Sequence, residues 1–239
     1  MAEEDGSGVA AVLRSLAFYA AFYAGSAVLV VWALVVEIFS PQQVWKVAEA
    51  WSKYHRACLR HLAGIRITVS GQLPASPALI ACKHESFFEA IDSLALVRNP
   101  AVFAKAELMR IPLWGRVARA HGLIPVSRDQ GARALRAMVA AARAAIAAER
   151  HLFIFPEGTR VPHGRQAKLQ AGFAGLYKML DLPVVPVAVR SGPLYQRRWM
   201  RPGTISIVIG TPIPSGLQRE EIEARVLAAI NVLNGLEGE

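Results

Sequence analysis

Residues 78–96 read ALIACKHESFFEAIDSLAL, and this stretch by itself indicates the fold class. The apolar run from Ala78 to Cys82 has the length of a buried strand, and the pattern from Ser86 to Arg98 predicts a helix. The polar segment KHES, Lys83 to Ser86, lies between them. A buried strand followed by polar residues and a helix is the repeating unit of an α/β fold.

The same alternation continues on both sides of this stretch. Further strands are predicted over 65–69, 101–105, 123–126, 151–155, 184–189 and 205–209, and further helices over 112–121, 131–149, 171–180 and 219–233. Strands that are apolar almost throughout and alternate with helices predict an α/β fold with a mostly parallel central sheet and helices on both faces. In such a sheet the ligand site lies beyond the carboxyl ends of the strands.

The amino-terminal region has a different pattern. Residues 15–36 contain no charge, and a helix of that length covers about 33 Å, close to the roughly 30 Å of a bilayer core. From Val44 to Leu62 apolar residues recur with helical spacing beside Lys and Arg. We predict a polar tail over 1–14, a two-helix membrane anchor over 15–63 and a globular domain over 64–239. A core helix and a helix packed on the domain are the alternatives, and spanning and lying in one leaflet both stay open.

Charge and composition narrow the partners. The 239 residues are 54% hydrophobic, with a net charge of +9 and a mean hydropathy of +0.31. Because Lys and Arg follow the apolar run, we expect the domain on the cytoplasmic face of the membrane, near anionic lipids. No nucleic-acid-binding motif is present, so we expect no nucleic-acid partner. Two cysteines exclude a disulfide framework and a four-cysteine zinc site, and we expect no metal.

Polar clusters with a basic residue follow four of the predicted strands. They are KHES, KAEL, SRD and PEGTR, and they supply Lys83, Lys105, Arg128 and Arg160. A mouth lined by several cations suits a phosphate group.

His84 is the candidate general base, because an imidazole takes up protons near neutral pH. Glu89 lies five residues on, and the two face each other only if His84 precedes the helix and Glu89 lies in its first turn. Ser86-x-x-Glu89 is also a capping-box pattern, which is the structural alternative for Glu89. Asp92 is a conceivable substitute acid, although its spacing fits less well.

Four ordered segments resemble the blocks of the glycerolipid acyltransferase family. They are KHESFFE (83–89), GLIPVSR (122–128), FPEGTR (155–160) and LPVVPVAV (182–189), and the resemblance runs from about Ile65 to Ile209. The signatures of P-loop, dinucleotide, serine-hydrolase and zincin enzymes are absent. One departure is that the family's first block usually has Asp where this chain has Glu89.

The resemblance implies a membrane-bound O-acyltransferase whose domain covers 64–239. It would transfer an acyl group from acyl-CoA or acyl-acyl carrier protein to the sn-2 hydroxyl of a lysophospholipid, 1-acyl-sn-glycerol 3-phosphate, without a cofactor. His84 would be the general base and Glu89 its orienting acid. The alternatives are another acceptor, such as a lyso-ornithine lipid or glycerol-3-phosphate, and a non-catalytic lipid-binding protein. Oligomeric state is not predicted.

The resemblance also implies an acceptor site. Arg128 and Arg160, with Lys105, would bind the acceptor's phosphate. Three neighbours of Arg160 in the third block are also expected there: Glu157, Gly158 and Thr159. For Glu157 a structural role, accepting hydrogen bonds from loop amides, is the alternative.

Overall fold

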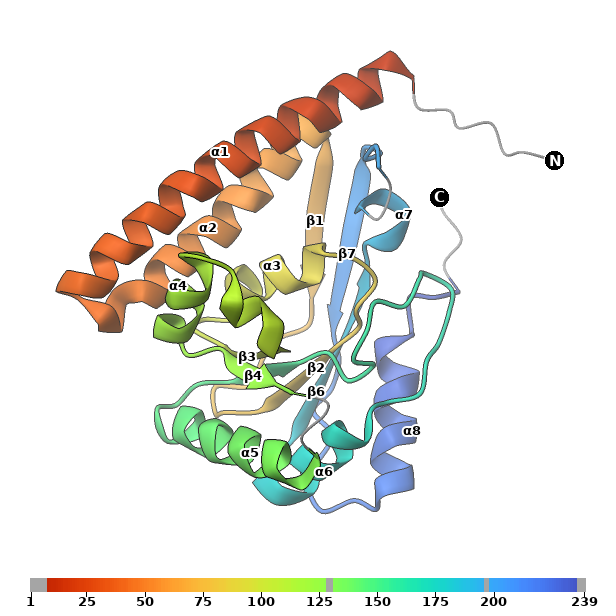
Figure 1. Ribbon diagram of the computed structural model, residues 1–239. Coiled ribbons are helices and arrows are strands. Elements are labelled where there is room, and N and C mark those ends of the chain that lie inside the picture. Colours follow the sequence, from red (N-terminus) through yellow and green to blue (C-terminus); the bar gives the residue numbers. More distant parts are fainter. Residues whose placement is uncertain (1–7, 128–130, 196–197, 236–239) are drawn as a thin grey trace.

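The computed structural model describes residues 8–127, 131–195 and 198–235, and its centre is a seven-stranded sheet in the order β1-β7-β6-β2-β5-β3-β4 (Figure 1). Every pair of neighbouring strands is parallel except β6 and β7, which are antiparallel. The mostly parallel sheet is therefore confirmed. Each strand overlaps a predicted one: β1 Ile65–Ser70, β2 Leu79–Cys82, β3 Ala101–Lys105, β4 Ile124–Val126, β5 Leu152–Ile154, β6 Val184–Arg190 and β7 Gly203–Ile209.

The helices of the domain also lie within the predicted ranges. They are α3 Phe88–Leu96, α4 Trp114–His121, α5 Gly131–Ala147, α6 Ala171–Leu180 and α8 Arg219–Ile230. Two short elements were not predicted, the 3₁₀-helix η3 (Ala106–Arg110) and the single turn α7 (Gly192–Tyr195). η3 begins directly after β3, and α7 begins two residues after the end of β6. Both lie at the edge of the sheet formed by the carboxyl ends of the strands, which also carries the polar clusters.

Two apolar cores lie on the two faces of the sheet. On one face Ile80 and Cys82 pack with residues of α3 and of the amino-terminal helices. On the other face Leu79 and Ala81 pack with residues of α5, α6 and α8. Successive residues of β2 therefore point to opposite cores, as the pleat of a strand requires. Helices on both faces of the sheet are confirmed.

The amino-terminal helix α1 (Val9–Phe39) is longer than predicted, and residues 9–14, expected in a polar tail, are helical. Its 31 residues cover about 46 Å at 1.5 Å per residue. In the described part of the chain it is the one helix long and apolar enough to cross a membrane. Figure 1 shows α1 lying lengthwise against the second helix, α2 (Val44–Cys58), to which the turn η1 (Pro41–Gln43) joins it.

The second helix is amphipathic, and part of its apolar side packs inside the protein. Trp51 Nε1 donates to Ser26 Oγ of α1 at 2.8 Å, and the Tyr54 hydroxyl donates to the Ala21 carbonyl at 2.7 Å. A π-helical turn, η2 (Leu59–Ala63), then leads into β1. The N-terminal region thus has one long apolar helix, α1, and not clearly a two-helix anchor. The second helix, α2, is packed on the protein, which was the alternative stated for it.

Candidate active site

His84 and Glu89 meet at the end of β2. His84 lies two residues after the strand, and its Nδ1 is 3.1 Å from Glu89 Oε2 in the first turn of α3. Because a carboxylate only accepts hydrogen bonds, Nδ1 carries the proton and Nε2 is left as an acceptor. The imidazole stacks on the Phe155 ring with centroids 4.1 Å apart, and the His84 side chain is 16% exposed. A partly exposed imidazole in this tautomer can take a proton from a hydroxyl.

Glu89 also closes the start of α3. The Ser86 amide donates to Glu89 Oε2 at 2.9 Å, while the Ser86 hydroxyl accepts from the Phe88 amide at 3.1 Å, in the manner of a capping box. The capping pattern is therefore present, and the same carboxylate also contacts His84, while a catalytic role of Glu89 stays a prediction. Capping fixes the side chain that in turn orients His84.

Asp92 is not a partner of His84. Its two oxygens accept from Arg56 Nε and Nη2 of α2 at 2.6 and 2.7 Å. Burial raises the pKa of Asp92, and the Arg56 guanidinium acts in the opposite direction. The suggestion of Asp92 as a substitute acid is therefore wrong, because its carboxylate is already held in a bidentate pair.

Lys83 does not line the mouth of the site, contrary to the sequence prediction. Its ammonium is fully buried and donates to Glu157 Oε1 at 2.7 Å, to Asn231 Oδ1 at 2.9 Å and to the Arg165 carbonyl at 3.0 Å. Glu157 Oε2 accepts the backbone amide of His84 at 3.3 Å. Glu157 thus has the surroundings of a structural carboxylate, and its contact with an acceptor stays a prediction.

Two of the other predicted cations, Lys105 and Arg160, lie at one edge of the sheet. β2, β5 and β3 are neighbours and parallel, so their carboxyl ends, followed or closed by His84, Arg160 and Lys105, share that edge. Lys105, Thr159 and Arg160 are exposed, and the Arg160 guanidinium carbon is 5.6 Å from the centre of the Phe87 ring. Gly158 has φ of 67°, a backbone conformation that favours glycine. Arg128 lies outside the described residues.

The sequence model of a family described as Acyltransferase matches residues 65–190. This is more than half of the chain. It includes the His84–Glu89 pair, called the dyad below, the buried Lys83–Glu157 pair and the exposed cations. The chain belongs to the acyltransferase family.

Relatives and a solved structure agree with this assignment. A 1-acyl-sn-glycerol-3-phosphate acyltransferase of Pseudomonas aeruginosa is 31% identical over 168 residues, which are 69% of this chain and 65% of that protein. A protein of the same name from Cocos nucifera is 24% identical over 91% of this chain and 73% of its own. The crystal structure of PlsC, the 1-acyl-sn-glycerophosphate acyltransferase of Thermotoga maritima, matches with a TM-score of 0.71 and 22% identity, over 95% of this chain and 98% of that one. It supports the fold.

A second carboxylate and histidine lie beside the dyad of this acyltransferase-family chain, and sequence reasoning missed them. Glu85 is buried, and its Oε1 is 2.8 Å from Nδ1 of His163 in the loop after β5. Glu85 Oε2 accepts the amides of Ser191 and Gly192 at 2.9 and 2.8 Å. Burial raises the pKa of Glu85, while the bonds from Gly192 and His163 oppose the rise. Glu85 thus joins the loop after β5 to the turn after β6.

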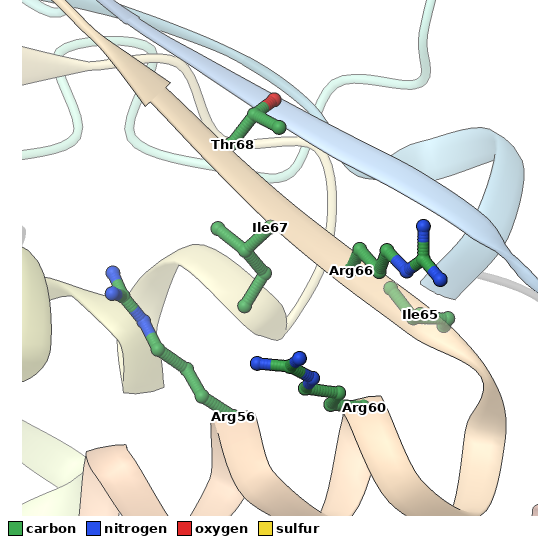
Figure 2. A pocket seen from close by; sticks show the side chains of 6 residues that line it. All are labelled: Arg56, Arg60, Ile65, Arg66, Ile67 and Thr68. Carbon is green, nitrogen blue, oxygen red and sulfur yellow. The ribbon is translucent and has the colours of Figure 1, made fainter.

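A hollow of about 410 Å³ lies elsewhere, along the edge strand β1, lined by Arg56, Arg60, Ile65, Arg66, Ile67 and Thr68 (Figure 2). Figure 2 shows Ile65 and Ile67 on the side of β1 that faces Arg56 and Arg60. Arg66 points to the other side of the strand, because successive residues of a strand alternate. Arg56 is already bound to Asp92. The three guanidinium groups therefore do not converge on one anion. Among the described residues, no group of three or more His, Cys, Asp or Glu side chains is placed to hold a metal ion.

Proposed function

We propose that the protein is a membrane-associated O-acyltransferase that acylates the sn-2 hydroxyl of 1-acyl-sn-glycerol 3-phosphate and forms phosphatidic acid. The observation that carries the proposal is the His84–Glu89 pair at 3.1 Å, which lies on the sheet edge that also presents Arg160 and Lys105. A base beside exposed cations suits an acceptor with both a hydroxyl and a phosphate. The names of the relatives support 1-acyl-sn-glycerol 3-phosphate as the acceptor.

In the proposed reaction His84 Nε2 takes the proton of the acceptor hydroxyl as its oxygen attacks the thioester carbonyl of the donor. The tetrahedral intermediate collapses, the C–S bond breaks, and the leaving thiolate takes the proton from the imidazolium. Glu89 holds Nδ1–H and stabilises the imidazolium between the two transfers. General base catalysis of this kind contributes about 10²- to 10⁴-fold. A thioester is already activated, so the chemistry needs neither a cofactor nor a covalent acyl-enzyme.

We assign the acceptor's phosphate to Arg160 and Lys105, with Arg128 from the second block. The Arg160 guanidinium carbon is 5.6 Å from the centre of the Phe87 ring, and Phe87 directly precedes α3, whose first turn carries Glu89. The exposed Thr159 and the half-buried Gly158 precede Arg160 in the chain, and we propose that they approach the acceptor through the hydroxyl and the backbone, respectively. The donor is acyl-CoA or acyl-acyl carrier protein.

We propose that α1 attaches the domain to the membrane through its outer face. One side of α1 is packed in the protein at Phe18 and Phe22, while ten large apolar side chains elsewhere on the helix are exposed, among them Val28 and Trp32 at 68% and 55%. An apolar face this long is typical of a surface that meets lipid. In this arrangement residues 15–63 form the membrane-anchoring region, α1 lies in one leaflet, and the domain from residue 64 is on the cytoplasmic side beside anionic lipids.

The catalytic assignment is tested by thiol release from acyl-CoA and from acyl-acyl carrier protein in the presence of 1-acyl-sn-glycerol 3-phosphate. We expect turnover by the wild type and a loss of at least about 100-fold in His84→Ala, with an unchanged melting temperature. His61→Ala is the matched control, because His61 is an exposed histidine outside the site. Full activity of His84→Ala would refute the base, and wild-type lipid binding without any thiol release would favour a lipid-binding protein.

The acceptor assignment is tested with Arg160→Ala and a panel of acceptors. We expect KM to rise about tenfold or more for the phosphate-bearing acceptor, and to change little for a monoacylglycerol, because a charge-assisted hydrogen bond is lost only in the first case. Arg219→Ala, which removes an exposed guanidinium paired with Glu223 on α8, is the control. Equal losses on both acceptors would contradict the contact between Arg160 and the phosphate. If the wild type preferred a lyso-ornithine lipid or glycerol-3-phosphate, that molecule would be assigned as the acceptor in place of 1-acyl-sn-glycerol 3-phosphate.

Membrane attachment is tested by flotation with anionic vesicles. Val28→Glu combined with Trp32→Glu places two charges on the outer face of α1, and we expect most of the protein to leave the vesicle fraction, since burying each charge in hydrocarbon is costly. Unchanged flotation of the double variant would show that another surface carries the attachment.

A further inference from the structure

Two buried serines meet behind the catalytic pair. Ser86 precedes α3, and Ser191 directly follows β6, so they come from elements far apart in the sequence. Both are fully buried, and their hydroxyl oxygens are 2.7 Å apart. The Ser191 hydroxyl also makes a short hydrogen bond to Oε1 of Glu89. The Glu89 carboxylate is thus contacted from the end of β6 as well as from its own helix.

The direction of these bonds follows from counting protons. The Glu89 carboxylate only accepts, so Ser191 donates its single hydroxyl proton to Oε1. Ser86 then donates to Ser191, and the Ser86 oxygen accepts the amide of Phe88 at 3.1 Å. The chain runs from the Phe88 amide through both hydroxyls to Glu89. Hydrogen bonds in such a chain strengthen one another where water is excluded.

The two oxygens of Glu89 therefore have different hydrogen-bond partners. Oε2 accepts His84 Nδ1–H at 3.1 Å and the Ser86 amide at 2.9 Å. Oε1 has the Ser191 hydroxyl, and its other contact is the Ser86 hydroxyl at 3.4 Å. Without Ser191, Oε1 would keep only the long contact, and the carboxylate would be freer to rotate about its last bond and swap oxygens toward the imidazole.

The backbone of Ser191 is itself fixed. Its amide and that of Gly192 both donate to Oε2 of Glu85, at 2.9 and 2.8 Å. Glu85 and Glu89 therefore hold the same residue, one by its backbone and the other by its side chain. A serine anchored in this way can impose its position on Glu89 rather than follow it.

We propose that Ser191 is a positioning residue of the acyl-transfer reaction, which fixes the Glu89 carboxylate so that His84 keeps its proton on Nδ1. The inference rests on the proposed function, because it assigns His84 as the base. It predicts that Ser191 matters only as long as the carboxylate at position 89 reaches its hydroxyl.

The test measures kcat, KM and melting temperature for Ser191→Ala, with Ser93→Ala as the matched control. Ser93 is equally buried on α3, but its hydroxyl donates to the Ala90 carbonyl and not to Glu89. We expect Ser191→Ala to lower kcat on the order of 10- to 100-fold with little change in KM, since a hydrogen bond to a charged group is lost away from the substrate. Ser93→Ala should leave kcat within about twofold. Ser191→Thr, which keeps the hydroxyl, should retain more activity than Ser191→Ala.

A double-mutant cycle separates positioning from a merely structural role. In Glu89→Asp the carboxylate is shorter by one C–C bond, about 1.5 Å, and no longer reaches Ser191, so adding Ser191→Ala should cost less than about twofold in kcat. A structural role would give the same loss in both backgrounds. Additive losses, or an unchanged kcat in Ser191→Ala while the wild type turns over and His84→Ala does not, would overturn the positioning role and leave the proposed function standing.

Failure of the proposed function is recognised separately. Nitrogen NMR of histidine-labelled protein reports the tautomer of His84 whether or not the acceptor is correct, with the signal assigned by His84→Gln. We expect one tautomer, protonated at Nδ1, in the wild type and a mixture in Ser191→Ala. The same single tautomer in both proteins would overturn the inference without reference to turnover.

Discussion

Replacing Lys83 by methionine should destabilise the protein far more than replacing any exposed lysine. Methionine has a similar length but no charge. In Lys83→Met the Oε1 atom of the buried Glu157 loses the Lys83 ammonium, while Oε2 keeps its hydrogen bond from the His84 amide at 3.3 Å. The Asn231 side chain and the Arg165 carbonyl also lose the ammonium that they bind at 2.9 and 3.0 Å. An ammonium has three N–H donors, and in the wild type each of them has one of these three acceptors.

The magnitude follows from the burial of the pair. Both side chains are 0% exposed, and removing one partner of a buried ion pair typically costs about 3–5 kcal/mol, because the other charge is left uncompensated. For a chain of this size 1 kcal/mol corresponds to about 2–4 °C, so the melting temperature should fall by about 6–20 °C. Lys53→Met is the control, because Lys53 is 64% exposed and pairs with Glu49 four residues earlier, where a pair is worth about 1 kcal/mol or less.

Denaturant unfolding of the single and double variants tests this reasoning. Lys83→Met combined with Glu157→Leu removes both charges, and we expect it to be more stable than Lys83→Met alone. A loss below about 1 kcal/mol in Lys83→Met, or additive losses in the double variant, would show that the two charges do not depend on each other.

Three further substitutions probe packing and burial away from the site. Gly25→Leu should lower the free energy of unfolding by about 1–3 kcal/mol, because even a Cβ at Gly25 overlaps the Tyr54 ring, whereas Gly172→Ala, which meets nothing, should be neutral in the same denaturant titration. Burial, with Arg150 nearby, lowers the pKa of His121 to about 4, whereas the unfolded chain takes up that proton near pH 6.5. His121 alone should therefore lower the free energy of unfolding by about 3 kcal/mol as the pH drops from about 6.5 to 4. His121→Gln should remove that part of the pH dependence, while the buried His55, with its pKa lowered to about 3, keeps its own part. Arg150→Met should cost about 2–4 kcal/mol, since the guanidinium donates to three backbone carbonyls; a melting temperature within 2 °C of the wild type would contradict this.

The strands and most helices could be predicted because each is encoded locally. The run from Val184 to Val189 is buried along its whole length, and such a segment is recognisable wherever it lies in the chain. The order of the strands is not encoded in this way. β7 lies between β1 and β6, parallel to the first and antiparallel to the second, and nothing in its seven residues specifies either neighbour. Pairing depends on how the whole set of apolar faces is buried together.

The same distinction applies to the site. His84 and Glu89 could be paired because one strand–helix unit holds both, five residues apart. Lys83 was expected to be exposed, as an unpaired lysine would be. Its partners Glu157 and Asn231 lie 74 and 148 residues away, so its burial has no local signal. Ser191 is likewise 102 residues from Glu89, and a serine after a strand is not distinctive in a sequence.

The helix α3 connects the amino-terminal helices with the chemistry of the site. Glu89 in its first turn holds His84, and Asp92, three residues later and therefore nearly one turn on, holds Arg56 of α2 through two hydrogen bonds. Asp92 is almost completely buried, so this pair is far less screened by solvent than a surface pair. The helix pair α1–α2 is thus fixed to the helix that carries Glu89. α1 also presents the apolar outer face that we propose meets lipid. In that proposal, the depth of this face in a bilayer would set the height of His84 above the lipid surface.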